Sequence, residues 1–322
     1  MRSELCAFVM SESVFSTPTA RNKLVEGCLD WVESHAPQFT PQGHPRIASD
    51  FQKRGSVFKA FSELGIVLEA LHRSCYRDRP AVVRLIEIWT EAVRQEGLLD
   101  DVNSTIELFH YNVVLFATLR KIGTAEPLIE ASVRRLSKRR AGTRGEMTPW
   151  RMLDVRHFMV QAGITHDFPP AHDLVRSSAL LRRIDLPETT DVDIYAITHL
   201  IIFLSDVGRA AVTAISPYEL AELREYVGTA LAMTYVESNW DLTAELLISR
   251  HGIGSLAKDE PLNYAASGGL CAAQSADGSM PHDPWLNPNR ESPTDGSEFK
   301  SRYHPTLVAL LLAAIDGTNS QS

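Results

Sequence analysis

Helical periodicity is the feature that most constrains this chain, because apolar residues recur three and four positions apart along almost its whole length. The alternating pattern typical of strands is nearly absent. The spacing predicts an all-α protein. The expected helices, with ends defined to about two to four residues, cover residues 20–35, 55–75, 79–96, 103–122, 126–138, 148–162, 169–182, 190–207, 216–235, 239–251, 262–274 and 303–316.

These helices pair into about six hairpins, and their repeat of roughly 40–55 residues is typical of helical arrays. Six hairpins close into an (α/α)6 toroid, in which one helix of each pair lies inside and the other outside. An open solenoid is the alternative, but it would need polar capping repeats, which the sequence lacks. We therefore expect one toroid domain over residues 19–322, after a flexible leader over residues 1–18.

Glycines that follow the second helix of five hairpins define a common register, since a left-handed glycine often ends a helix. The reference glycines are Gly123, Gly163, Gly208, Gly254 and Gly317. Thirteen positions earlier stand His110, Trp150, Tyr195, Asp241 and His304. Nine positions earlier stand Val114, Asp154, His199, Glu245 and Val308. Residues four apart share a helix face, so in a toroid both sets would face the central axis.

Several of these polar residues interrupt apolar helices such as DIYAITHLIIFL and DLTAELLI. Burying an ionisable group is costly unless the group is paired or solvated. A polar cavity at the ring centre removes that cost, whereas the alternative is that each residue is satisfied separately in the core. The cavity hypothesis predicts four catalytic residues: His199, Glu245, Asp154 and Tyr195.

In this hypothesis His199 is neutral near pH 7 and acts as a general base. The carboxylates orient it or bind a substrate amine, and Tyr195 donates a hydrogen bond. Either Arg209 or Arg290 binds an anionic group by a forked contact. Between the last two helices, residues 275–302 form either a lid or a loose surface loop. The predicted substrate-binding residues are Asp241, His304, His110, Arg209, Trp150 and Arg290.

Composition and missing motifs exclude several classes of protein. The net charge of -8 argues against nucleic-acid binding, and no apolar run approaches the roughly 20 residues of a membrane span. Four cysteines without a C-x-x-C pair suit a reducing, cytoplasmic compartment. Nucleotide-binding and serine-hydrolase motifs are absent. No cofactor and no metal are expected, although a divalent ion on His199 and the carboxylates remains an alternative.

The segments LCAAQSADGSMP and YHPTLVALLLAAI resemble a hairpin turn of the form Q-x-x-D-G-S and the inner helix that follows it in the α/α-toroid superfamily. That superfamily includes terpenoid cyclases and protein prenyltransferase β-subunits. The resemblance covers one hairpin and implies fold rather than activity. The chain lacks a D-x-D-D motif, and no cysteine falls on the polar positions, so neither squalene-type cyclisation nor a prenyltransferase zinc site is expected.

The segment DIYAITHLIIFLSDVGR is similar to uncharacterised toroid proteins of bacterial natural-product pathways, some of which are associated with aziridine formation in azinomycin-type compounds. This resemblance implies a tailoring enzyme that closes a ring on a small amino-acid-derived substrate, with loss of sulfate or a similar leaving group. The alternative is a non-catalytic ligand-binding or scaffold subunit. Such a subunit would form a homo- or hetero-oligomer with a related toroid protein.

Overall fold

The computed structural model describes residues 13–41, 51–95, 98, 108–138, 146–178, 181, 188–254, 261–281 and 297–319. All regular secondary structure in these residues is helical, which confirms the all-α prediction. Seven helices lie outside: α1 (Pro18–Ser34), α2 (Ala36–Phe39), α4 (Pro80–Arg94), α7 (Pro127–Lys138), α9 (Ala171–Ser177), α11 (Pro217–Val236) and α13 (Pro261–Ala273). Six lie inside: α3 (Phe51–His72), α6 (Phe109–Ile122), α8 (Pro149–Gln161), α10 (Asp191–Leu204), α12 (Trp240–Ile253) and α14 (Ser297–Asn319).

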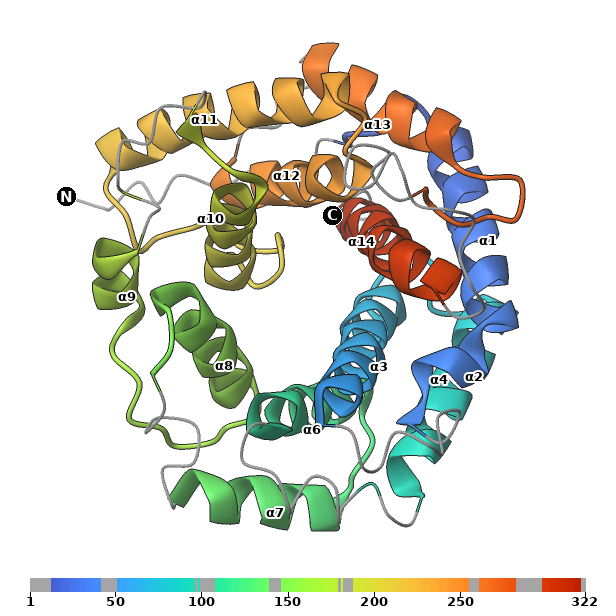
Figure 1. Ribbon diagram of the computed structural model, residues 1–322, viewed down its shortest axis with the longest axis vertical. Coiled ribbons are helices and arrows are strands. Elements are labelled where there is room, and N and C mark those ends of the chain that lie inside the picture. Colours follow the sequence, from blue (N-terminus) through green and yellow to red (C-terminus); the bar gives the residue numbers. More distant parts are fainter. Residues whose placement is uncertain are drawn as a thin grey trace, which may run out of the picture.

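The six inner helices contact one another in chain order, and α14 returns to contact α3 (Figure 1). The outer helices pack behind them: α4 on α3, α7 on α6, α9 on α8, α11 on α12, and α1 on α14. Inner helices therefore alternate with outer ones along the chain and run in the same direction. Side-chain pairs agree with this, because Tyr195 contacts Asp241 and, one turn further along both helices, His199 contacts Glu245.

Inner helices are buried on nearly all sides, whereas outer helices are buried on one face. The inner helix α12 is buried continuously from Leu242 to Ile253, because it has neighbours on nearly every side. The outer helix α4 buries one face, which includes Val82, Leu85 and Trp89. Among the described residues, no helix combines the length and the apolar character needed to cross a membrane.

Local capping chemistry explains several helix ends. Thr190 with Asp193 and Ser216 with Glu219 form capping boxes at the starts of α10 and α11. Gly123, Gly163, Gly208 and Gly254 adopt positive φ after α6, α8, α10 and α12, as the register assumed. The prediction that Gly317 ends a helix was wrong, because Gly317 lies inside α14, which continues to Asn319.

The described part of the chain begins at residue 13, within the region that the sequence suggested as a leader. Val14 and Phe15 are buried, and the Val14 amide donates to Asp316 Oδ1 over 2.8 Å. Arg21 from α1 also contacts Asp316, with 2.6 Å between Nη1 and Oδ2. This pairing compensates a fully buried carboxylate, so residues 13–17 are fastened to the end of α14.

The Q-x-x-D-G-S segment forms a turn that packs against α1. Gln274 Nε2 donates to the carbonyl oxygens of Leu24 and Gly278, each over 3.0 Å. Gly278 has φ +90, and a Cβ at this position would lie 2.1 Å from the carbonyl oxygen of Gly27. The turn therefore requires glycine both for its conformation and for its contact with α1.

We expect Gly278→Ala to lower the free energy of unfolding by at least about 2 kcal/mol, because it adds left-handed strain to a backbone clash. Urea denaturation measures this change. Gly268→Ala is the matched control: it lies within α13, and an added Cβ meets nothing within 4 Å. The control should be unchanged or more stable by about 0.5–1 kcal/mol. Equal effects of the two substitutions would contradict this account of the turn.

Candidate functional site

The inner helices enclose a cavity of about 200 Å³. Its polar lining residues lie at one level of the ring: Lys59, Ser62, Glu63, His110, Tyr111, Trp150, Arg151, Asp154, His199, Glu245 and His304. Its apolar lining residues lie further along the same helices, toward their C-terminal ends: Ile66, Val67, Val114, Phe158, Ile202, Phe203, Val207, Ile248, Leu307, Val308 and Leu311. The cavity is thus a cup with a polar rim and apolar walls.

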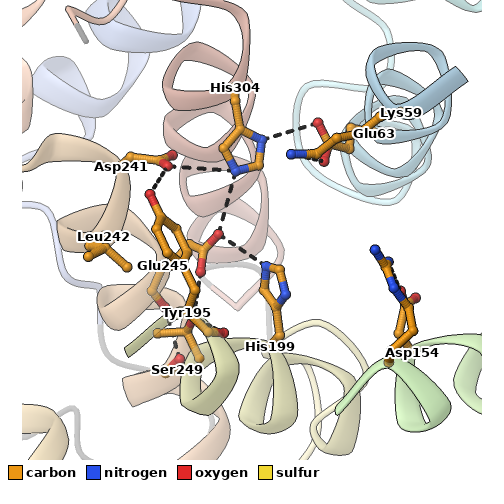
Figure 2. Close-up of polar contacts among 12 residues, drawn as sticks. Lys59, Glu63, Asp154, Tyr195, His199, Asp241, Leu242, Glu245, Ser249 and His304 are labelled. Atoms are coloured by element: carbon orange, nitrogen blue, oxygen red, sulfur yellow. Dashed lines mark hydrogen bonds and ion pairs between the residues drawn. The ribbon is translucent and has the colours of Figure 1, made fainter. Parts of the chain in front are cut away.

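Glu245 from α12 is the most buried carboxylate on the cavity wall, with 3% of its surface exposed. The Thr198 hydroxyl donates to Glu245 Oε2 over 2.5 Å. Glu245 Oε1 lies 3.4 Å from His199 Nε2 and 3.7 Å from His304 Nε2 (Figure 2). Burial alone would raise the pKa of Glu245, but the two imidazoles hold it well below its usual value.

His304 from α14 links two inner helices through its two ring nitrogens (Figure 2). Nδ1 lies 3.1 Å from Glu63 Oε2, and Nε2 lies 3.7 Å from Asp241 Oδ2. Burial opposes protonation, but Asp241 and Glu63 raise the pKa of His304 well above its ordinary value. His304 therefore favours the imidazolium form. Within the described residues, no three His, Cys, Asp or Glu side chains are grouped to hold a metal ion.

His199 from α10 is held by Glu245 on one side and by Trp150 on another, with the ring centroids of His199 and Trp150 5.2 Å apart. Its second nitrogen points toward the part of the cavity where Asp154 lies (Figure 2). Burial lowers the pKa of His199, but Glu245 and then Asp154 outweigh it and raise the pKa. The sequence could not predict the direction of this shift, because it does not reveal how close Glu245 lies to His199.

Tyr195 and Asp241 support this group from behind rather than line the cavity. The Tyr195 hydroxyl donates to Asp241 Oδ2 over 2.5 Å. Burial raises the pKa of Asp241, and nearby Glu245 adds to this effect. On the other side of the cavity, Asp154 pairs with Arg151 at 3.0 Å, and burial raises the pKa of Asp154 despite that cation.

The structure thus brings most of the predicted site residues together. A continuous contact network joins five of them: Tyr195, His199, Asp241, Glu245 and His304. Three more line the same cavity: His110, Trp150 and Asp154. Arg209 does not belong to this group, because it pairs with Glu69 at 2.7 Å near the C-terminal ends of the inner helices. Arg290 lies outside the described residues.

Sequence reasoning missed the residues that α3 contributes. Lys59 and Glu63 lie four positions apart in the apolar segment SVFKAFSELGIVLEAL and both line the cavity. The register did not reach them because no glycine ends α3, which finishes at His72. The signal available was a charged pair at helical spacing inside an otherwise apolar helix. Three further residues of the site also went unnoticed: Tyr111, Arg151 and Thr198.

The raised pKa of His304 predicts a pH dependence of stability. The stabilisation is complete below the unfolded-state pKa of about 6.5, and it is lost as pH rises through the higher folded-state pKa. In this range one linked proton contributes a slope of up to about 1.4 kcal/mol per pH unit. We expect His304→Gln to weaken the decline in unfolding free energy between pH 6 and 9, measured by urea denaturation.

The matched control is His172→Gln on the outer helix α9, where the side chain is 60% exposed. This variant should keep the wild-type slope. If His304→Gln also kept it, the ion pairs of His304 with Glu63 and Asp241 would not stabilise the protonated ring.

Comparison with known proteins gives a family but no activity. A family model described as a domain of unknown function, DUF6895, matches residues 25–314. No curated protein and no solved structure matches the chain. The matched region contains every site residue described above, from Lys59 to His304. Because the match covers most of the chain, the protein belongs to the DUF6895 family.

Proposed function

We propose that this protein is a small-molecule tailoring enzyme of bacterial secondary metabolism that performs acid/base chemistry in the central cavity. The position of His199 carries the proposal. Glu245 holds one ring nitrogen, and the other nitrogen faces the cavity (Figure 2). A carboxylate on one side of an imidazole fixes the tautomer, so the opposite nitrogen can exchange a proton with a bound molecule.

We also propose that the helices form an (α/α)6 toroid of the α/α-toroid superfamily. The closed order of contacts among the six inner helices supports this, as does the packing of the Q-x-x-D-G-S turn. A cytoplasmic location is part of the same proposal, and the cysteine pattern supports it.

The reaction class that suits this site is an intramolecular displacement. A substrate nitrogen attacks a carbon of the same molecule and forms a carbon–nitrogen bond. The carbon–oxygen bond to a sulfate or similar group breaks, and that group departs with the bonding electrons. The proton of the nitrogen passes to the cavity-facing nitrogen of His199. Arg151 and Lys59 lie on the cavity rim, where their charges stabilise the departing anion. The similarity to aziridine-associated proteins supports a ring-closing reaction of this kind.

This mechanism fixes the sign of the pH dependence. His199 accepts a proton only when it is neutral, and Glu245 raises its pKa. The rate should therefore rise with pH through the raised pKa of His199 and level off above it. A rate that falls across this range would assign His199 the role of general acid instead.

We expect His199→Asn to reduce turnover by about 10²–10⁴-fold, the usual loss for a general base, with little change in melting temperature. Liquid chromatography with mass spectrometry detects turnover as consumption of a compound in a bacterial metabolite extract. Glu245→Gln should lose less activity but more stability, because it leaves the imidazoles of His199 and His304 without their shared carboxylate.

His172→Asn is the control, since His172 lies on the outer helix α9. This variant should turn over like the wild type. A stable, fully active His199→Asn would remove His199 from the chemistry. Saturable binding of a compound without conversion by the wild type would favour the ligand-binding or scaffold alternative.

A further inference from the structure

The turn that follows α10 lies at the apolar end of the cavity. Val207 lies in this turn and lines the cavity, and only 3% of its surface is exposed. Ile202 and Ile248 line the adjacent wall. Val207 therefore forms part of the floor of the cup, at the end opposite the polar rim.

The turn has an unusual backbone conformation. Asp206 has φ +49 and Val207 has φ +59, and Gly208 continues the left-handed run with φ +75. This region is unfavourable for residues other than glycine, and for a β-branched residue it is a genuine outlier. Such conformations persist where the surroundings hold them, and they concentrate at functional sites.

Ion pairs hold the turn from both sides of Val207. Asp206 Oδ1 lies 3.6 Å from Lys121 of α6 and accepts a hydrogen bond of 2.5 Å from Gln161 of α8. Arg209 contacts Glu69 of α3 at 2.7 Å. Three inner helices thus fix the two residues that flank Val207, so the floor has a defined position.

Two side chains with a permanent positive charge, Lys59 and Arg151, lie on the polar rim. The imidazoles of His199 and His304 line the cavity with them, as do the carboxylates of Glu63, Asp154 and Glu245. Each of these carboxylates already faces a cation of the protein. The side chains of Lys59 and Arg151 are 48% and 38% exposed, so they meet solvent at the mouth. The six inner helices also direct the positive ends of their dipoles to this side.

We propose that the cavity binds an organic anion whose charged group lies between Lys59 and Arg151 and whose apolar body extends to Val207, which limits its length. The inference rests on the proposed function, because it names the substrate class of the same cavity. A charged group at the rim keeps its ion contacts and its hydration, while the apolar body leaves water. Arg151 and Lys59 act as binding residues, and Val207 acts as a specificity-determining residue.

Isothermal titration calorimetry with straight-chain carboxylates of four to ten carbons tests whether the cavity prefers a negatively charged ligand with an apolar body. We expect affinity to rise about fourfold per methylene and then to stop rising at a limiting length. Alkylamines of equal length should bind at least tenfold more weakly. Arg151→Met should weaken binding of the best carboxylate at least fivefold, whereas Arg134→Met on the outer helix α7 should not. Amines that bind as tightly as acids, or affinity independent of length, would overturn the proposal.

The floor is tested with Val207→Gly, which removes the side chain and accepts positive φ. We expect the limiting length to increase by at least one carbon. Val308→Phe provides a second test from the α14 wall, and it should shorten the limit. The inference fails if Val207→Gly folds without moving the limit. If Val207→Gly does not fold, Val308→Phe decides, and an unchanged limit in that variant refutes the inference.

These measurements separate the inference from the proposed function, because binding of a carboxylate requires no turnover. His199→Asn should retain the chain-length dependence. If that dependence is present while His199→Asn remains fully active, the acid/base proposal fails alone. If His199→Asn loses turnover but carboxylates show no length dependence, the inference fails alone.

Discussion

The buried carboxylate of Glu245 is the interaction on which the site depends. It lies on α12, while its partners Thr198 and His199 lie on α10 and His304 lies on α14. A buried charge without partners would be strongly destabilising, so these three helices must meet at the same height. His304 then carries the linkage to Glu63 on α3. One electrostatic requirement thus sets the alignment of four inner helices and the orientation of the imidazole that faces the cavity.

The two ends of the ring use charge differently. At the rim, Lys59 and Arg151 are half-buried and near solvent, which suits exchange with a small molecule. At the other end, Arg209 pairs with Glu69 of α3 and Asp206 pairs with Lys121 of α6. These two ion pairs hold the turn around Val207. The apolar wall between these ends separates the two groups. The solvent-exposed cations and the ion pairs that fix the turn thus lie at different ends of the same six helices.

The sequence predicts the helices and much of the site because both follow local rules. Apolar spacing defines the elements, and glycines such as Gly208 and Gly254 have the positive φ that makes them usable reference points. The same rule explains the failures. The glycine register did not include Glu63, because no glycine ends α3. Arg209 was predicted as a site residue, but it follows Gly208 in the chain and therefore lies at the opposite end of the ring, where it pairs with Glu69.

Protonation was the part that local rules do not determine. Whether His199 is charged depends on a carboxylate 46 positions later in the chain, on a different helix. Burial and ion pairing act in opposite directions on its pKa, and only the distance between the two side chains decides which dominates. The sequence therefore predicts the helices, but it does not predict the charge states of buried side chains.

The fastening of Val14 and Arg21 to Asp316 has a consequence for how the chain reaches its fold. Residues separated by about three hundred positions meet in the folded ring, and such nonlocal contacts slow folding. During synthesis, α3 and α12 emerge before α14, the helix that both of them contact in the finished ring. Their apolar faces would stay uncovered until α14 has emerged, a period in which a chaperone would reduce aggregation.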